Sequence, residues 1–253
     1  MLETYLKNRL EKNRILLMTH IVLGYPSLDD SYRIVETMVK AGVDIMELQI
    51  PFSEPIADGP VILHANQKAL GQGATVQECI DLAGLVADNF DIPFLFMTYY
   101  NIIFQYGEDR FVSTMAQKNI KGAIVPDLPP EEGKNYVNAM KKQDLSPIFI
   151  FSPTTSDERM KYIAGLGKGF IYCIARKGVT GVDTDFSEEL NIYLTKCRKA
   201  TRLPLALGFG VKEKKDVDFL KGKIDIAVIG SETIRLIDQK GIKAVGDFIN
   251  NLR

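Results

Sequence analysis

Eight short apolar runs, each followed by a segment with apolar residues at helical spacing, constrain the fold of this chain more than any other feature. The runs are rich in β-branched and aromatic residues and do not alternate with polar ones, which is typical of strands covered on both faces. They span 16–23, 43–50, 94–97, 123–125, 147–150, 169–174, 203–207 and 224–229. Eight strand-then-helix repeats in 253 residues predict a (β/α)8 TIM barrel.

A doubly wound open sheet is the alternative fold. Such a sheet usually carries G-x-G-x-x-G after its first strand, whereas this chain has Gly24, Tyr25 and Pro26 there. The glycine-rich run 165–169 precedes a strand instead of following one, which indicates an ordinary turn. We therefore expect one TIM-barrel domain over 1–253, with a capping helix at 2–10 that covers the bottom of the barrel.

Local signals predict where several helices begin and end. Thr75 with Glu78 and Thr155 with Glu158 match the capping box, in which side chains of the first turn satisfy free backbone N–H groups. Gly42, just before the second run, fits a helix-ending glycine.

The charge balance gives no reason to expect nucleic acid or an anionic membrane as a partner. Lys and Arg total 31 against 32 for Asp and Glu, and the charges are scattered along the chain. No apolar run approaches the ~20 residues that cross a bilayer. Residues 1–13 are charged throughout and lack the apolar core of a signal peptide, so we expect a cytoplasmic location.

Cysteine and histidine are sparse. The three cysteines lie far apart without a C-x-x-C pair, which argues against a disulfide framework, a zinc site or a redox couple. The two histidines, His20 and His64, are too isolated to suggest a metal site or a Ser-His-Asp triad. We therefore expect no metal, and we expect carboxylates to perform any acid/base chemistry.

Glu47 is the leading catalytic candidate, because it lies towards the end of the second predicted strand and TIM-barrel active sites are built at strand C-termini. A carboxylate pointing into the barrel mouth would be poorly solvated, which suits proton transfer. An ion pair with Lys or Arg at the barrel rim is the alternative for Glu47. Asp58, in the proline-rich loop that follows, could be held opposite Glu47, although Asp58-Gly59-Pro60 alone is most often just a turn.

Glycines follow the last three predicted strands, at 178–181, 208–210 and 230–231. Barrels often bind phosphate on the loops after strands seven and eight, because bare backbone N–H groups and a helix N-terminus favour an anion. Turns also need glycine, so each of these glycine-containing segments alone is a weak signal of phosphate binding. Together their placement predicts a ligand that is a phosphate ester.

Residues 47–60, ELQIPFSEPIADGP, closely resemble the signature of the tryptophan synthase alpha subunit family. The likeness continues in family order through 97–101, 126–129, 176–181, 208–210 and 230–231. The resemblance implies retro-aldol cleavage of indole-3-glycerol phosphate to indole and glyceraldehyde 3-phosphate in tryptophan biosynthesis, with no cofactor in this chain. It also implies a partner β subunit that carries pyridoxal phosphate, in a heterotetramer of two α and two β chains.

The resemblance assigns roles to individual residues. Glu47 becomes the acid/base group that protonates indole C3 and then removes the hydroxyl proton on the adjacent side-chain carbon, and Asp58 stabilises positive charge on the indole nitrogen. Substrate-binding positions are Tyr99 and Tyr172 at the indole, Thr180 in a loop that closes over the substrate, and Gly181, Gly210, Gly230 and Ser231 at the phosphate. Phe209 is a further substrate-binding position. Read without the family, the two tyrosines could equally be core aromatics with satisfied hydroxyls.

Four positions depart from the family pattern. The family usually has glycine at Gln49, aspartate at Tyr25 and at Glu54, and an aromatic residue at His20. Gln49 lies two residues from Glu47 and so on the same side of the strand, where it could change the surroundings of Glu47 or the space for indole. Glu54 lies in the loop that the family uses near its β subunit.

Two other functions stay open at this point. Lys177, just beyond the sixth predicted strand, could form a Schiff base as in an aldolase, although such a lysine usually needs a desolvated site and Lys177 adjoins Arg176. The departures at Gln49 and Tyr25 would also fit a catalytically weakened barrel that acts mainly as a ligand-binding regulator of a β subunit.

Overall fold

The computed structural model describes residues 1–175, 188–208 and 210–253. Its strands are β1 (Leu16–Val22), β2 (Ile45–Gln49), β3 (Phe94–Met97), β4 (Gly122–Ile124), β5 (Ser146–Phe151), β6 (Ile171–Ile174), β7 (Leu205–Gly208) and β8 (Ile226–Ile229). Each strand pairs in parallel with the next, and β8 pairs with β1, so the sheet is a closed barrel. The predicted TIM-barrel fold is confirmed.

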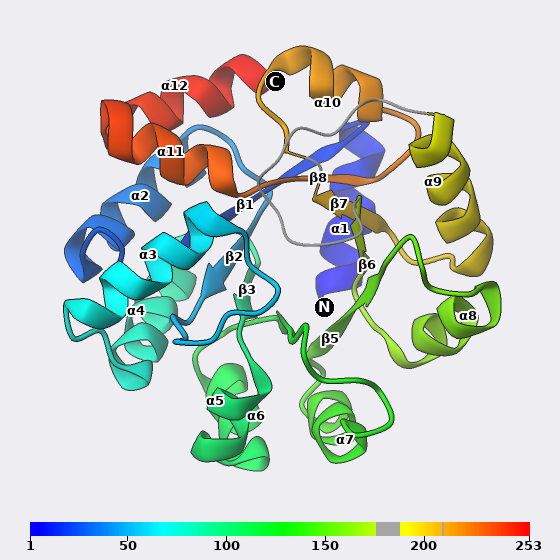
Figure 1. Ribbon diagram of the computed structural model, residues 1–253, viewed down its shortest axis with the longest axis horizontal. Helices are drawn as coiled ribbons and strands as arrows, with labels where there is room; N and C mark the ends of the chain where they lie inside the picture. Colours follow the sequence, from blue (N-terminus) through cyan, green and yellow to red (C-terminus); the bar gives the residue numbers. More distant parts are fainter. Residues whose placement is uncertain (176–187, 209) are drawn as a thin grey trace.

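Helices surround this barrel (Figure 1). One helix, α1 (Leu2–Lys12), precedes β1. The others are α2 (Leu28–Lys40), α3 (Pro60–Gly71), α4 (Val76–Asn89), α5 (Tyr100–Tyr106), α6 (Glu108–Gln117), α7 (Lys134–Lys142), α8 (Asp157–Leu166), α9 (Glu188–Ala200), α10 (Lys214–Leu220), α11 (Ser231–Lys240) and α12 (Ile242–Leu252). Within the described ranges, no helix is both long and apolar enough to span a membrane.

The sequence pattern located the strands well, since every predicted run coincides with a strand whose ends differ by two residues at most. The capping box of Thr75 and Glu78 is confirmed at the start of α4. The box predicted for Thr155 and Glu158 is wrong. Ser156 caps α8 instead, because the Thr155 hydroxyl already accepts a hydrogen bond from the Ser152 N–H at 3.0 Å in the preceding turn.

The ends of two further elements also match expectation. Gly42 follows the C-cap of α2 with φ +93°, a left-handed conformation that glycine adopts without a steric penalty. Helix α1 extends over 2–12, slightly beyond the predicted 2–10.

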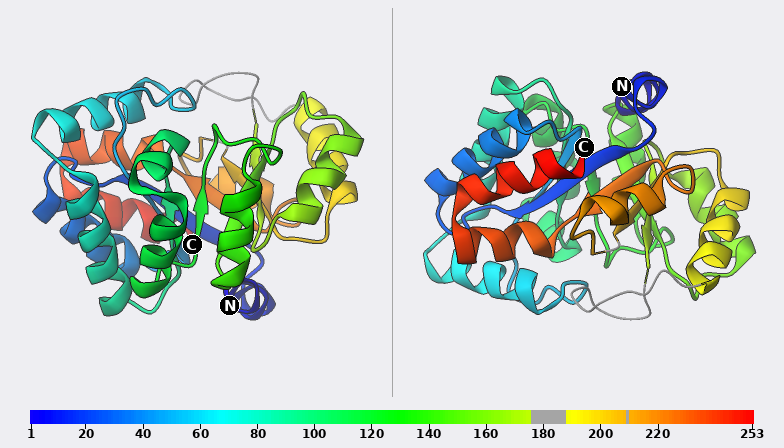
Figure 2. Two further views of the ribbon diagram at one scale, coloured as in Figure 1. Left: turned by 90° about the horizontal axis from the view of Figure 1, so that it is seen from below. Right: turned by 90° about the horizontal axis from the view of Figure 1, so that it is seen from above.

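Side chains on the strands point alternately to the barrel interior and to the helices. The interior cluster includes Met18 of β1, Ile45 of β2 and Val228 of β8, together with Leu2 and Leu6 of α1. Helix α1 therefore closes one end of the barrel, as predicted. Figure 2 shows α1 at the end opposite the segment between β2 and α3, so the C-terminal strand ends form the other, open end.

Candidate active site

Glu47 lies inside the barrel mouth beside a histidine. It is two residues beyond Ile45, an interior residue of the same strand, and so faces the interior as well. Strand pairing sets His20 of β1 opposite Glu47, with His20 Nδ1 3.5 Å from Glu47 Oε1. Both side chains are buried, with Glu47 only 2% exposed. Strand register thus places an imidazole and a carboxylate side by side at the C-terminal end of the barrel.

Asp58 lies in the loop between β2 and α3 and faces the same end of the barrel. Its Oδ2 accepts a hydrogen bond from Gln49 Nε2 at 2.6 Å. The Tyr99 hydroxyl accepts one from the Ala57 N–H at 3.1 Å and donates to Asp58, while the Phe52 ring stacks on Tyr99 with centroids 5.2 Å apart. These contacts hold the proline-rich loop against the mouth and bring the second predicted carboxylate into the neighbourhood of Glu47.

The two predicted tyrosines both act as donors to carboxylates. Burial, then the charges of Glu47 and Asp58 and a hydrogen bond to Glu47, raise the pKa of Tyr172 well above its usual value. Burial and the charge of Asp58 likewise raise the pKa of Tyr99. Both phenols therefore stay protonated at neutral pH. The alternative that they are core aromatics with satisfied hydroxyls holds in part, because the groups that satisfy those hydroxyls include the candidate carboxylates themselves.

Asp58 and His20 both titrate above their ordinary range. Burial raises the pKa of Asp58 and the charge of Glu47 adds to this, against the opposing effects of His20, Gln49 and Tyr99. Burial lowers the pKa of His20, but the hydrogen bond to Glu47 and the charges of Glu47 and Asp58 outweigh burial and raise it overall. A cluster of groups that shift one another in this way is typical of a functional site.

Two of the predicted glycines, Gly208 and Gly230, lie close to residues of the same mouth. A Cβ added at Gly208 would come within 3.0 Å of the Tyr172 hydroxyl oxygen, so glycine there leaves room for that tyrosine. Gly230 is the N-cap of α11, and Ser231 is its first residue. A Cβ at Gly230 would lie 3.8 Å from the Cβ of His20, which places this helix N-terminus beside the carboxylate cluster.

Several predicted positions lie outside the described residues. They are Thr180, Gly181 and Phe209 among the substrate-binding candidates, and Lys177, the candidate Schiff-base lysine. Gly210 is described and has φ +74°, a conformation suited to glycine. Gly210 is itself exposed to solvent.

Sequence reasoning missed two residues of the site. Asn66 is fully buried on α3, and its Oδ1 accepts hydrogen bonds from the Phe52 N–H at 2.9 Å and from Gln49 Nε2 at 3.4 Å. An amide at a position one helical turn after the buried Ile62 was the available signal. His20 was noted only as a departure and as an isolated histidine, since its partner Glu47 is 27 positions away and meets it only through strand pairing.

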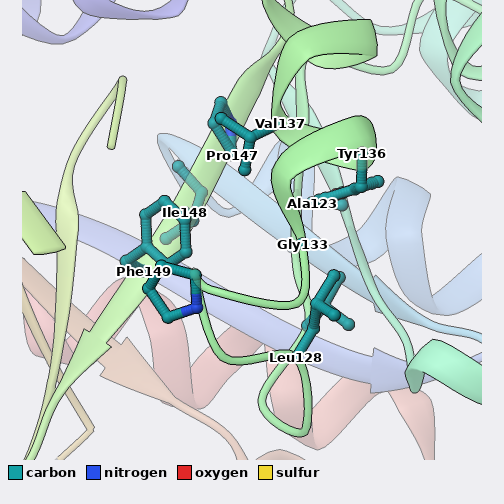
Figure 3. Close-up of a pocket in the computed structure, with 10 residues that line it drawn as sticks. Ala123, Leu128, Gly133, Tyr136, Val137, Pro147, Ile148 and Phe149 are labelled. Atoms are coloured by element: carbon teal, nitrogen blue, oxygen red, sulfur yellow. The ribbon is translucent and has the colours of Figure 1, made fainter. Parts of the chain in front are cut away.

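Other features of the described chain do not add to this site. The pocket in Figure 3 lies between β4, β5 and α7, has a volume of about 10 Å³ and contains neither Glu47 nor Asp58. That volume is about one water molecule, so the pocket is a small packing cavity. Across the same described ranges, no three His, Cys, Asp or Glu side chains are grouped as metal ligands would be.

The family model of the tryptophan synthase alpha chain matches residues 6–250. A tryptophan synthase alpha chain from Desulforapulum autotrophicum is 63% identical over 252 residues, covering 100% of both chains. Tryptophan synthase from Mycobacterium tuberculosis has a TM-score of 0.93 at 26% identity, over 99% of this chain and 96% of that one. The tryptophan synthase complex from Pyrococcus furiosus gives 0.86 at 26% identity, over 94% and 97%. Because the likeness runs through the whole barrel, this chain belongs to the tryptophan synthase alpha chain family, the lyases that cleave indole-3-glycerol phosphate to indole and glyceraldehyde 3-phosphate.

Proposed function

We propose that Glu47 is the acid/base catalyst of indole-3-glycerol phosphate cleavage in this chain and that Asp58 binds the indole nitrogen. One observation carries the proposal: two carboxylates, from β2 and from the loop after it, lie at one barrel mouth among groups that exchange or donate protons. Such a pair is what a reaction needs when one proton is delivered and another removed.

The reaction then needs no group from outside the chain. Glu47 in its acid form gives a proton to indole C3, and the ring nitrogen becomes positively charged opposite Asp58. Glu47, now a carboxylate, takes the proton from the hydroxyl on the adjacent side-chain carbon. As the carbon–carbon bond breaks, its electron pair returns to the ring, which becomes indole, and the hydroxyl carbon becomes the aldehyde of glyceraldehyde 3-phosphate. The substrate gains one proton at C3 and loses one from its hydroxyl group, so Glu47 ends in the acid form in which it began.

We assign substrate binding to the remaining predicted positions. Tyr99 and Tyr172 would flank the indole, since both already contact the carboxylates. Gly210, Gly230 and Ser231 would hold the phosphate, because the N-terminus of α11 offers backbone N–H groups and a favourable dipole. Thr180, Gly181 and Phe209 are assigned to substrate binding from the family resemblance alone.

The wider setting is also a proposal. Family members bind no cofactor of their own, because pyridoxal phosphate belongs to the β subunit. We infer that this chain passes indole to such a subunit in an assembly of two α and two β chains, and the similar Pyrococcus furiosus protein is itself a tryptophan synthase complex. We further propose that residues 1–253 act as one domain and that the enzyme works in the cytoplasm.

Indole release from indole-3-glycerol phosphate by the purified chain, with and without a β subunit, tests the assignment. Glu47→Gln keeps the side-chain shape and removes the titratable group, so cleavage should stop while glyceraldehyde 3-phosphate still binds. A Glu47→Gln protein that cleaves as fast as the unmodified chain would sink the assignment. Negligible cleavage by the unmodified chain with the β subunit present would instead favour the regulator hypothesis, and borohydride trapping of a substrate adduct would favour a Schiff base at Lys177.

A further inference from the structure

Glu47 and Asp58 lie at the two ends of a row of polar side chains. His20 Nδ1 is 3.5 Å from Glu47 Oε1, and Gln49 Nε2 donates to Asp58 Oδ2 at 2.6 Å. In the pairing of β1 with β2, His20 is opposite Glu47 and Val22 is opposite Gln49. The side chains of His20, Glu47 and Gln49 therefore face the same side of the sheet, with His20 and Glu47 at one level and Gln49 at the next. His20 and Gln49 are the two residues between the carboxylates.

The middle of this row holds two complementary polar atoms. His20 Nε2 and Gln49 Oε1 are both buried, and among the described residues neither has a hydrogen-bond partner at strict geometry. The Gln49 side chain is nonetheless close enough to His20 to help raise the pKa of that histidine. A protonated Nε2 is a donor and an amide Oε1 is an acceptor. Because leaving buried polar atoms unpaired is costly, a hydrogen bond between these two atoms would be favourable.

We propose that His20 and Gln49 are positioning residues that join Glu47 and Asp58 into one hydrogen-bonded chain, with His20 holding Glu47 and Gln49 holding Asp58. The inference rests on the roles proposed above for the two carboxylates. Glu47 must serve two atoms of the substrate in turn, and a carboxylate fixed in one place by its neighbour does so more effectively than a freely rotating one. The same row of hydrogen bonds gives a role to His20 and Gln49, which stand where the family usually has an aromatic residue and a glycine.

The hydrogen-bonded connection from Glu47 to Asp58 is complete only when both ring nitrogens of His20 carry a proton. Nδ1–H then donates to Glu47 and Nε2–H donates to Gln49, whereas a neutral imidazole has one N–H and breaks one link. The titratable groups that face His20 are Glu47 from β2 and Asp58 from the following loop, and Tyr172 from β6 faces Glu47. The contacts from α11 are uncharged: Gly230, and the Thr233 hydroxyl, which donates to the His20 carbonyl oxygen at 3.3 Å. Cleavage should therefore show an alkaline inflection that belongs to His20.

The test measures kcat and KM for indole release against pH in the full chain with its β subunit. His20→Phe keeps a ring of similar size and removes both nitrogens, so kcat should fall about tenfold or more, a part of the ~10²–10⁴-fold contribution of acid/base catalysis. KM should change little, because the phosphate is held elsewhere. His20→Asn places an amide near the position of Nδ1 and should recover much of kcat, without the alkaline inflection.

Gln49→Met tests the other link and covers the case in which His20→Phe does not fold. It keeps the length of the side chain, removes the amide, and should lower kcat and abolish the same inflection. His64→Phe is the matched control, because His64 is the exposed histidine of α3 that packs edge-on against Tyr25 outside the row. It should leave the profile unchanged.

The proposal is overturned if either His20→Phe or Gln49→Met folds and keeps both the kcat and the alkaline inflection of the unmodified chain. That outcome is separable from failure of the proposed function. If Glu47→Gln abolishes cleavage while the two other variants behave like the unmodified chain, only the positioning role fails. If Glu47→Gln cleaves normally, the proposed function itself fails.

Discussion

Two buried carboxylates, three residues apart in the sequence, have opposite surroundings. Asp44 is the residue before β2 and lies at the end that α1 covers. It accepts hydrogen bonds from Arg9, from Arg253 at 2.5 Å and from the Leu17 N–H at 2.9 Å. Glu47, nearer the other end of the same strand, meets His20 and Tyr172. Two guanidinium groups, which do not give up their protons, surround one carboxylate, and groups that share or donate protons surround the other.

This difference separates a structural carboxylate from the proposed acid/base group. Guanidinium partners fix the charge of Asp44 and satisfy its oxygens, so it ties α1, β1 and the chain end together. Glu47 has imidazole and phenol partners instead, which share or donate protons. An ion pair with Lys or Arg was the alternative for Glu47, and the structure has that arrangement at Asp44 instead. Four predictions test the contrast.

The largest effect is expected for Glu47, at the C-terminal end of the barrel. Glu47→Gln should lower kcat for indole release by about 10²–10⁴-fold, the usual contribution of a general acid/base group. The midpoint of thermal unfolding should stay close to that of the unmodified chain, because the amide keeps the shape and can still accept a hydrogen bond from Tyr172. A kcat loss accompanied by a large drop in thermal stability would mean that Glu47 is structural, like Asp44.

The corresponding substitution at Asp44, at the closed end of the barrel, should change stability and leave catalysis intact. Asp44→Asn removes the charge that Arg9 and Arg253 share, and we expect a loss of about 3 kcal/mol in the free energy of unfolding. This is the low end of the ~3–5 kcal/mol for breaking a buried pair, because both arginines reach solvent. Urea unfolding measures it. Indole release per folded molecule should be unchanged. A loss of kcat without a loss of stability would contradict a purely structural role for Asp44.

A third prediction concerns the room that Tyr172 needs. Gly208→Ala should destabilise the fold by about 1–3 kcal/mol through overpacking, because the new methyl group lies 3.0 Å from the Tyr172 hydroxyl oxygen. Adding Tyr172→Phe removes that oxygen and should recover part of the loss. Thermal unfolding of both single variants and the double variant measures the recovery. Strict additivity would show that Gly208 serves another purpose.

The smallest effect is on the pH dependence of stability. The pKa of His20 is higher in the folded chain than its ordinary value of 6.5, so its contribution to stability is present below 6.5 and is lost as pH rises through the folded pKa. The raised pKa of Asp58 acts in the same direction at lower pH. Urea unfolding from pH 6.5 upward should therefore show a steeper decline for the unmodified chain than for His20→Phe. Equal slopes would contradict the direction of the His20 shift.

Local patterns predicted the fold well and the site in part. Strand and helix positions follow from apolar spacing within a few residues, which a sequence records directly. Glu47 and Asp58 could be chosen as candidates from the sequence because strand ends and loops are local features. The capping box at Thr155 failed because its hydroxyl has a second use in the preceding turn. His20 was set aside because a lone histidine in a strand has no local sign of its partner.

The sequence by itself determined the closed parallel barrel, its capping helix and the end at which the chemistry lies, because burial of apolar side chains imposes its period on neighbouring residues. Only the tertiary structure decided which buried carboxylate is paired with guanidinium groups and which with an imidazole and a phenol. Asp44 meets Arg253 across 209 positions, and Glu47 meets His20 only through the pairing of β1 with β2. These partners come together when the barrel closes, and the charge and hydrogen bonding of a buried group depend on what closure brings beside it.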